Sequence, residues 1–300
     1  VSQLLSDICD EVFIYTPKIN NELINKNNIS SPLFNARNKV LTALLQNEIK
    51  PNLGLSGSGP ETNIMRSTLF AFGILNENST ELNINNLKDN NIQIVIDTIH
   101  KFFISSGEKG KNFAELYDKL TLPKYKIGLK LGVVPIYIAV IFHIYKQHAV
   151  IVNSNDKEVE IKAQTLENIN KTPSNYRLVL EDWNEVKQTY INNLDELFIK
   201  NVIASEREYN TFNYIVRAMQ RWFLALSKYA KEADSEYIGN DKFEKLSLPI
   251  RKLKNQLRSS ELNARELLFN KLPEIFGKTI DNGLINAVKK AKEKIDYLSN

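Results

Sequence analysis

The chain is poor in the residues on which disulfide-bonded and turn-rich folds depend. It has 1 cysteine, 11 glycines and 9 prolines in 300 residues. The lone Cys9 excludes an internal disulfide and a thiolate zinc cluster. So few turn-forming residues argue against a β-sandwich, a propeller or a collagen-like repeat. No apolar run reaches the ~18 residues of a membrane span. These absences favour a soluble, cytoplasmic protein without membrane contact.

Motifs of catalysis and cofactor binding are also scarce. The chain has 3 histidines, and their spacing matches no metal-binding helix motif. The glycine-rich stretch Gly54–Gly59 continues into Pro60, where a Walker A loop needs a lysine followed by serine or threonine. No pair of carboxylates or nucleophile motif stands out. We therefore expect no catalytic residues, no metal, no cofactor and no enzymatic activity in this chain.

The material that is present suffices for a large hydrophobic core. Hydrophobic residues make up 43% of the chain and charged residues 25%, with a net charge of +4. This composition excludes a disordered chain. The net charge is too small to predict a nucleic-acid partner by itself.

Apolar residues recur at helical spacing over most of the chain, which predicts a mainly α, multi-helical protein. We divide it into an N-terminal helical segment (1–88), a middle segment (89–180) and a C-terminal helical segment (181–300). Because the chain begins at Val1 without Met, we expect a fragment of a longer protein.

The middle segment has the element order of a winged helix. Its expected parts, in chain order, are a helix over 89–105, a short helix after Asn112, a basic loop from Pro123 to Gly132, an apolar helix from Val133 to Tyr145 and a β-hairpin formed by Ala149–Val152 and Glu158–Ile161. We expect this to be the single hairpin of the protein, with no larger sheet. In DNA-binding winged helices the third helix reads the major groove. Here that helix has no polar stripe, which argues against sequence-specific recognition.

Two clusters of basic residues are candidate binding surfaces. The first interleaves an aromatic ring with cations, a pattern suited to phosphates and a stacked base, and its candidate nucleic-acid-binding residues are Lys111, Lys124, Tyr125, Lys126 and Lys130. The second is a candidate partner-binding surface formed by Arg251, Lys252, Lys254 and Arg258. A solvated, inactive surface is the alternative for both.

Several blocks of the sequence resemble a segment of very large bacterial P-loop ATPases from defence islands, among them PglY-like ATPases of BREX-type systems. The blocks, in chain order, are LSDICDEVFIYTPKINNELIN, ISSPLFNARNKVLTALL, GLSGSGPETNIMRSTL, FAELYDKLTLPKYKIGLKLGVVPIYIAVIF and LSLPIRKLKNQLRSSELNARELLFNKLPEIFG. In the fourth block Pro123, Tyr125, Gly132, Val133 and Pro135 match the family pattern. Lys124 and Lys126 replace its second proline and its glycine.

The resemblance implies a central or C-terminal piece of such an ATPase, with a role in restricting phage or other foreign DNA. The family's nucleotide site lies outside this segment, so no ATPase residue is carried over. Two hypotheses follow. The chain contacts DNA without sequence preference, with Lys124–Lys130 on the phosphates, or it is a structural scaffold that docks other domains of the parent protein or other defence-system subunits.

Overall fold

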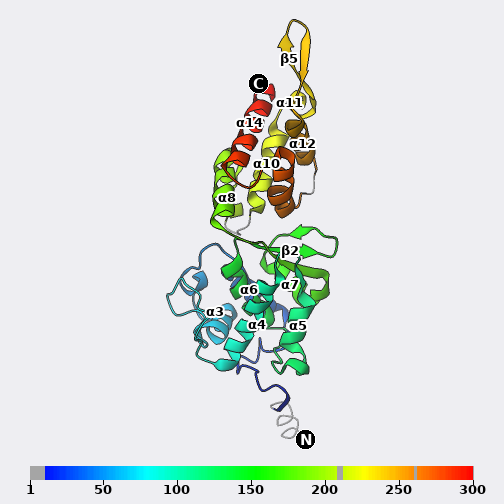
Figure 1. The fold of residues 1–300 in the computed structure, drawn as a ribbon. Coiled ribbons are helices and arrows are strands. Elements are labelled where there is room, and N and C mark those ends of the chain that lie inside the picture. Colours follow the sequence, from blue (N-terminus) through cyan, green and yellow to red (C-terminus); the bar gives the residue numbers. More distant parts are fainter. Residues whose placement is uncertain (1–10, 208–211, 260–261, 300) are drawn as a thin grey trace. The chain divides into compact units, whose positions relative to one another are not determined.

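The computed structural model describes residues 11–207, 212–259 and 262–299. Contacts divide the chain into two compact units, Val1–Asp182 and Trp183–Asn300. Helices dominate both units (Figure 1), which confirms the prediction of a mainly helical protein. Cys9 lies outside the described residues. No helix in the described part of the chain is both long and apolar enough to cross a membrane.

Two helices of the first unit, α4 (Asn90–Ser106) and α5 (Phe113–Thr121), begin at residues whose side chains cap them. The Asp89 carboxylate accepts hydrogen bonds from the backbone N–H groups of Asn91 (2.8 Å) and Ile92 (2.9 Å), and the Asn112 side chain accepts one from Ala114 (2.8 Å). Such caps satisfy N–H groups that the first helical turn leaves without partners. The helical elements are α2 (Ser31–Leu44), η1 (Pro51–Gly54), α3 (Pro60–Met65), η2 (Arg66–Phe70), α4 (Asn90–Ser106), α5 (Phe113–Thr121), η3 (Pro123–Tyr125), α6 (Val134–Tyr145), α7 (Ala163–Lys171) and η4 (Pro173–Asn175).

An antiparallel sheet of four strands lies in the same unit, in the order β1-β4-β2-β3. Ile151 of β2 pairs with Val159 of β3 on one side, which confirms the predicted hairpin. On its other side Ile151 pairs with Leu178 of β4, and β4 pairs with β1. The strands are β1 (Lys111–Asn112), β2 (Ala149–Asn153), β3 (Glu158–Val159) and β4 (Tyr176–Leu180).

The expectation of one hairpin and no larger sheet is therefore wrong. β4 follows α7 in the chain, and its neighbours β1 and β2 are both distant in sequence. Long-range pairing of this kind leaves little signal in the local sequence, because the tendency of a segment to form a strand depends on its neighbours in the sheet. The winged-helix assignment of residues 89–180 stays a prediction.

α6 lies at the centre of the hydrophobic core. Every residue from Val134 to Phe142 is buried, as expected for a helix that is apolar on all sides. The core extends from Ile19 to Leu178 and includes residues from before and after position 88, such as Val40 and Ile96. The predicted boundary at residue 88 thus runs through one shared core.

The second unit packs helices around its own apolar centre, which includes Leu194, Met219, Leu253, Leu268 and Val288. Tyr190 is buried there, and its hydroxyl donates to the carbonyl of Leu268 at 2.9 Å. The helical elements are α8 (Glu185–Leu197), η5 (Ile199–Asn201), α9 (Ala204–Arg207), α10 (Asn213–Ala225), α11 (Lys228–Glu232), α12 (Leu248–Leu257), η6 (Glu266–Lys271), α13 (Leu272–Phe276) and α14 (Asn282–Ser299).

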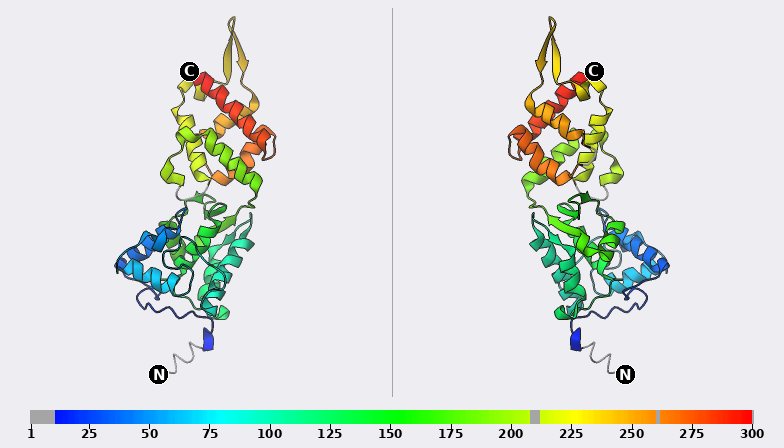
Figure 2. Two further views of the ribbon diagram at one scale, coloured as in Figure 1. Left: turned by 90° about the vertical axis from the view of Figure 1, so that its left-hand side faces the viewer. Right: turned by 90° about the vertical axis from the view of Figure 1, so that its right-hand side faces the viewer.

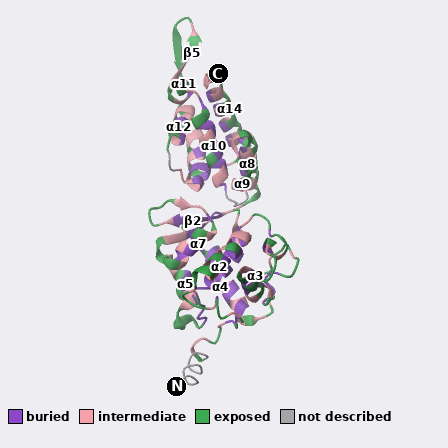
Figure 3. Cartoon of the chain, turned by 180° about the vertical axis from the view of Figure 1, so that it is seen from behind, coloured by how far each residue is buried: buried purple, intermediate pink, exposed green. Residues whose placement is uncertain are grey.

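A second hairpin, β5 (Ser235–Gly239) with β6 (Lys242–Lys245), extends past the helices of this unit (Figure 2). Among the strands of the described residues these two pair only with each other, and most residues of the hairpin are exposed (Figure 3). The turn residues Asn240 and Asp241 have φ of 51° and 56°, a conformation that Asn and Asp favour in two-residue hairpin turns. The Asn240–Asp241 dipeptide is therefore a signal for this hairpin in the sequence, and the spacing of apolar residues does not reveal it.

Candidate nucleic-acid interface

The basic loop between α5 and α6 alternates buried apolar residues with exposed lysines. Ile127 and Leu129 are buried, and the Leu129 N–H donates to the Leu120 carbonyl at 2.8 Å. Lys124, Lys126 and Lys130 are exposed. The apolar side chains therefore anchor the loop while the lysines extend into solvent.

A distant segment of the chain, residues 13–27, braces this loop from end to end. The Tyr15 N–H donates to the Lys126 carbonyl at 3.0 Å, and the Gly132 N–H donates to the Lys26 carbonyl at 2.8 Å. The Thr16 hydroxyl donates to the Ile127 carbonyl. The bonds from Tyr15 and Thr16 satisfy two carbonyls of the loop, and the bond from Gly132 attaches the end of the loop to the same segment.

Two glycines allow the close approach of the two segments. A Cβ on Gly128, whose φ is 66°, would lie 2.4 Å from the Phe13 ring. A Cβ on Gly132 would lie 1.9 Å from the carbonyl oxygen of Ile24. Any side chain at either position would displace the bracing segment, so both glycines are required by packing.

A buried ion pair fixes the C-terminal end of the loop. The Arg37 guanidinium donates to the carbonyls of Leu131 (3.1 Å) and Gly132 (2.8 Å). It also donates from Nε to Glu167 Oε1 at 2.9 Å, and from Nη2 to Oε2. Arg37 and Glu167 are 3% and 1% exposed. Burial raises the pKa of Glu167, and the guanidinium opposes that rise.

The predicted site residues are only partly brought together. Lys124 Nζ lies 5.3 Å from the centre of the Tyr125 ring, a cation–π contact on the exposed face. No ion pair recorded among the described residues involves Lys124, Lys126 or Lys130. These three lysines and the ring form one cationic surface.

Lys111 does not belong to that surface. It lies on β1, before the first turn of α5, and its ammonium donates to the Ser105 hydroxyl at 3.0 Å. The loop begins at the opposite end of α5, which is about 13 Å long at 1.5 Å per residue. Lys26, by contrast, is exposed and adjoins the loop through its carbonyl. No local pattern points to it, since about a hundred residues separate Lys26 from Gly132 in the chain.

The second cluster, on α12, has a different environment. Lys254 is 1% exposed, and its ammonium donates to the Ala233 carbonyl. Burial lowers the pKa of Lys254. Arg251 donates to the Leu246 carbonyl at 3.0 Å, and Arg258 donates to the Lys231 carbonyl.

Three cations of this cluster therefore bond to backbone carbonyls of their own unit, but only Lys254 does so from a buried position, and Arg258 is exposed. The buried ammonium of Lys254 is not available to an acidic partner surface, which corrects its assignment as a partner-binding residue. Lys252 is exposed and remains a candidate for partner contact.

Comparisons of the chain with protein-family models, with curated proteins and with solved structures found no match.

Proposed function

We propose that the first unit contacts DNA through its basic loop and recognises phosphates without reading the base sequence. The observation that carries this proposal is the set of three exposed lysines on a braced loop, with Tyr125 beside them. Lysine ammonium groups make point-charge contacts with phosphates, whereas base recognition mostly uses Arg, Asn or Gln in a groove. The chain itself is proposed to be non-catalytic.

The geometry around α6 supports contact at the loop and not at a recognition helix. The order α4, β1, α5, α6, β2 is that of a winged helix, with β4 between β1 and β2 in the sheet. Because α6 is buried from Val134 to Phe142, it has no face to place in a major groove. A winged-helix-like module that binds by its loop is the finer fold assignment that we propose.

The biological setting of the proposal comes from the sequence resemblance alone. A piece of a large bacterial defence-island P-loop ATPase would act on phage or other foreign DNA, and a phosphate-binding loop without base preference suits a target of unknown sequence. Nucleotide hydrolysis would take place elsewhere in the parent protein.

Fluorescence anisotropy with random DNA duplexes at several salt concentrations tests the DNA contact. Replacing Lys124, Lys126 and Lys130 by Ala is expected to weaken binding and to flatten the slope of log K against log salt by up to about 3 units. The matched control removes three exposed lysines of the second unit, as K200A/K252A/K289A. An equal effect of both triple variants, a preference of the wild type for one sequence, or no binding by the wild type at low salt would contradict the proposal.

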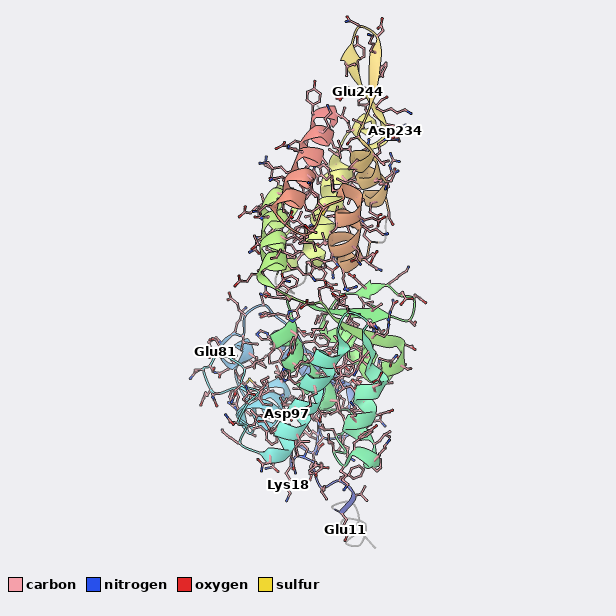
Figure 4. All side chains as sticks on the ribbon, in the orientation of Figure 1. Glu11, Lys18, Glu81, Asp97, Asp234 and Glu244 are labelled. Atoms are coloured by element: carbon pink, nitrogen blue, oxygen red, sulfur yellow. The ribbon has the colours of Figure 1, made fainter. Side chains whose placement is uncertain are left out.

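The scaffold function is the second candidate, and the β5–β6 hairpin favours it. Tyr237 and Phe243 are 57% and 65% exposed, and their ring centres are 5.5 Å apart. Ile238 is also exposed, on the same projecting hairpin, where Figure 4 labels Glu244. An exposed apolar group of this kind is typical of a protein-binding surface.

Sedimentation of this chain mixed with the separately expressed ATPase domain of its parent protein tests this alternative. The Y237S/F243S variant is expected to lose the complex, and K242S, on the same hairpin, is expected to retain it. A complex that both variants form equally well would exclude the hairpin as the docking element.

A further inference from the structure

A cavity of about 520 Å³ opens in the first unit between the bracing segment, the start of α2 and the consecutive elements α3 and η2. This volume is in the range of small-molecule sites in proteins. Its walls come from stretches that are distant in sequence: four residues between positions 18 and 23, Leu33, and five residues between positions 60 and 71. Figure 4 labels Lys18 in this unit.

The cavity is cationic. Lys18 and Arg66 are the only charged residues among the described residues that line it, and both are exposed. In the part of the chain that the structure describes, no recorded ion pair includes either of them. Two cations and no carboxylate among the described residues that line this cavity favour an anionic ligand.

Asparagine amides add hydrogen-bond donors to the cavity, and the amide of Asn21 also holds two parts of the cavity wall together. The Asn21 amide donates to the Ser67 hydroxyl at 3.0 Å, and that hydroxyl donates to the Asn63 carbonyl at 2.8 Å. The side chains of Asn20 and Asn63 line the cavity and are exposed. The segment between Lys18 and Leu23 is thus attached directly to η2.

The rest of the lining is apolar. Leu23 is 59% exposed, and it lines the cavity together with Leu33 and Pro60. The neighbouring Ile24 is fully buried, and the backbone on either side is bonded to the basic loop at Tyr15 and Lys26. The cavity is therefore formed before any ligand binds, which lowers the entropic cost of binding.

We propose that this cavity binds a phosphate monoester of mononucleotide size. The guanidinium of Arg66 is suited to two phosphate oxygens at once, and the ammonium of Lys18 adds a point charge. The asparagine amides supply further donors, and Leu23, Leu33 and Pro60 contact the apolar face of the base. The ligand is a free mononucleotide or the phosphorylated 5′ end of a DNA strand.

Calorimetric titration of the full chain with 2′-deoxyadenosine 5′-monophosphate (dAMP), 2′-deoxyadenosine and inorganic phosphate tests the proposal. The dAMP is expected to bind at least about tenfold more tightly than either of the other two. The variant K18Q/R66Q is expected to weaken dAMP binding by about tenfold or more. K101Q, which removes an exposed lysine of α4, is expected to leave it unchanged. Unaltered thermal unfolding of K18Q/R66Q would show that the fold is intact.

Equal binding of dAMP and 2′-deoxyadenosine, no dAMP binding, or no loss in K18Q/R66Q would overturn the proposal. Oligonucleotides with and without a 5′-phosphate distinguish the two sources, because only a strand-end site prefers the phosphorylated form and loses that preference in K18Q/R66Q. The K124A/K126A/K130A variant is expected to bind dAMP like the wild type, so this inference and the DNA-binding proposal fail independently.

Discussion

The basic loop and helix α12 carry similar clusters of cations, yet their surroundings are opposite. In the loop, Lys124, Lys126 and Lys130 are exposed. On α12, Lys254 is buried, and Arg251 and Arg258 donate to backbone carbonyls. Clusters of like charge in a sequence therefore do not by themselves indicate a binding surface.

The difference arises from the backbone carbonyls near each cluster. α11 ends at Glu232, and the last carbonyls of a helix have no partners within it. Lys254 and Arg258 satisfy the carbonyls of Ala233 and Lys231 at this helix end. In the basic loop, N–H and hydroxyl donors of residues 15 and 16 satisfy the carbonyls of Lys126 and Ile127, and the lysines are exposed.

Removal of the support beneath the basic loop is the severest test of this contrast. Arg37→Met leaves the buried Glu167 carboxylate and the Gly132 carbonyl without the donor that Arg37 supplies, while the Leu131 carbonyl keeps its hydrogen bond from the Asn170 amide. We expect a loss of about 3–5 kcal/mol in the free energy of unfolding of the first unit. Circular dichroism during chemical denaturation measures it, while fluorescence follows the second unit, which contains both tryptophans.

The double variant R37M/E167L is the control for this prediction. Because it removes the unpaired charge as well, it should be more stable than R37M alone. A change of less than about 1 kcal/mol in R37M would show that the ion pair does not support the loop.

Neighbouring lysines on α12 test the other side of the contrast. Lys254→Met leaves the Ala233 carbonyl without its donor, and we expect a loss of about 1–3 kcal/mol in the second unit. Lys252→Met changes an exposed side chain and is expected to stay within about 0.5 kcal/mol. Tryptophan fluorescence during denaturation measures both variants. Equal losses would mean that the burial of Lys254 has no energetic consequence.

The pH dependence of stability sharpens the same comparison. Burial lowers the pKa of Lys254, the charge of Arg258 adds to this, and Asp234 opposes it. Between that lowered pKa and the ordinary lysine pKa of about 10.4, the unfolded chain binds more protons than the folded chain. The free energy of unfolding therefore rises with pH in this range. The stability difference between wild type and K254M should therefore grow from pH 8 to pH 10.5. A difference that shrinks over this range would contradict the assigned burial.

The smallest effect is expected at Tyr125. Tyr125→Leu removes the ring beside Lys124, and exposed cation–π contacts contribute only about 0.5–1 kcal/mol. Denaturation should show a loss of that size or less. The salt slope of DNA binding should not change, because no phosphate contact is removed. A slope reduced by about 1 unit would instead show that the ring positions Lys124 on a phosphate.

Local patterns in the sequence were sufficient for the elements whose signals are local. The apolar run of Val133–Tyr145 predicted α6, and Asn112 predicted the start of α5. The pairing of β2 with β3 followed from two β-type runs and a short turn. The strands β1 and β4 were missed because their stability depends on partners far away in the chain.

The sequence by itself determined a mainly helical protein, the buried third helix of the middle segment and the location of its basic residues. The tertiary structure alone decided which of those cations are buried or bonded to backbone carbonyls and which are exposed, because those contacts join separate segments of the chain. Residues 13–27 reach the basic loop only in the folded chain, and only there do Lys18 and Arg66 line one cavity. Neither arrangement has a local signal, since the contacts join residues about 50 to 110 positions apart.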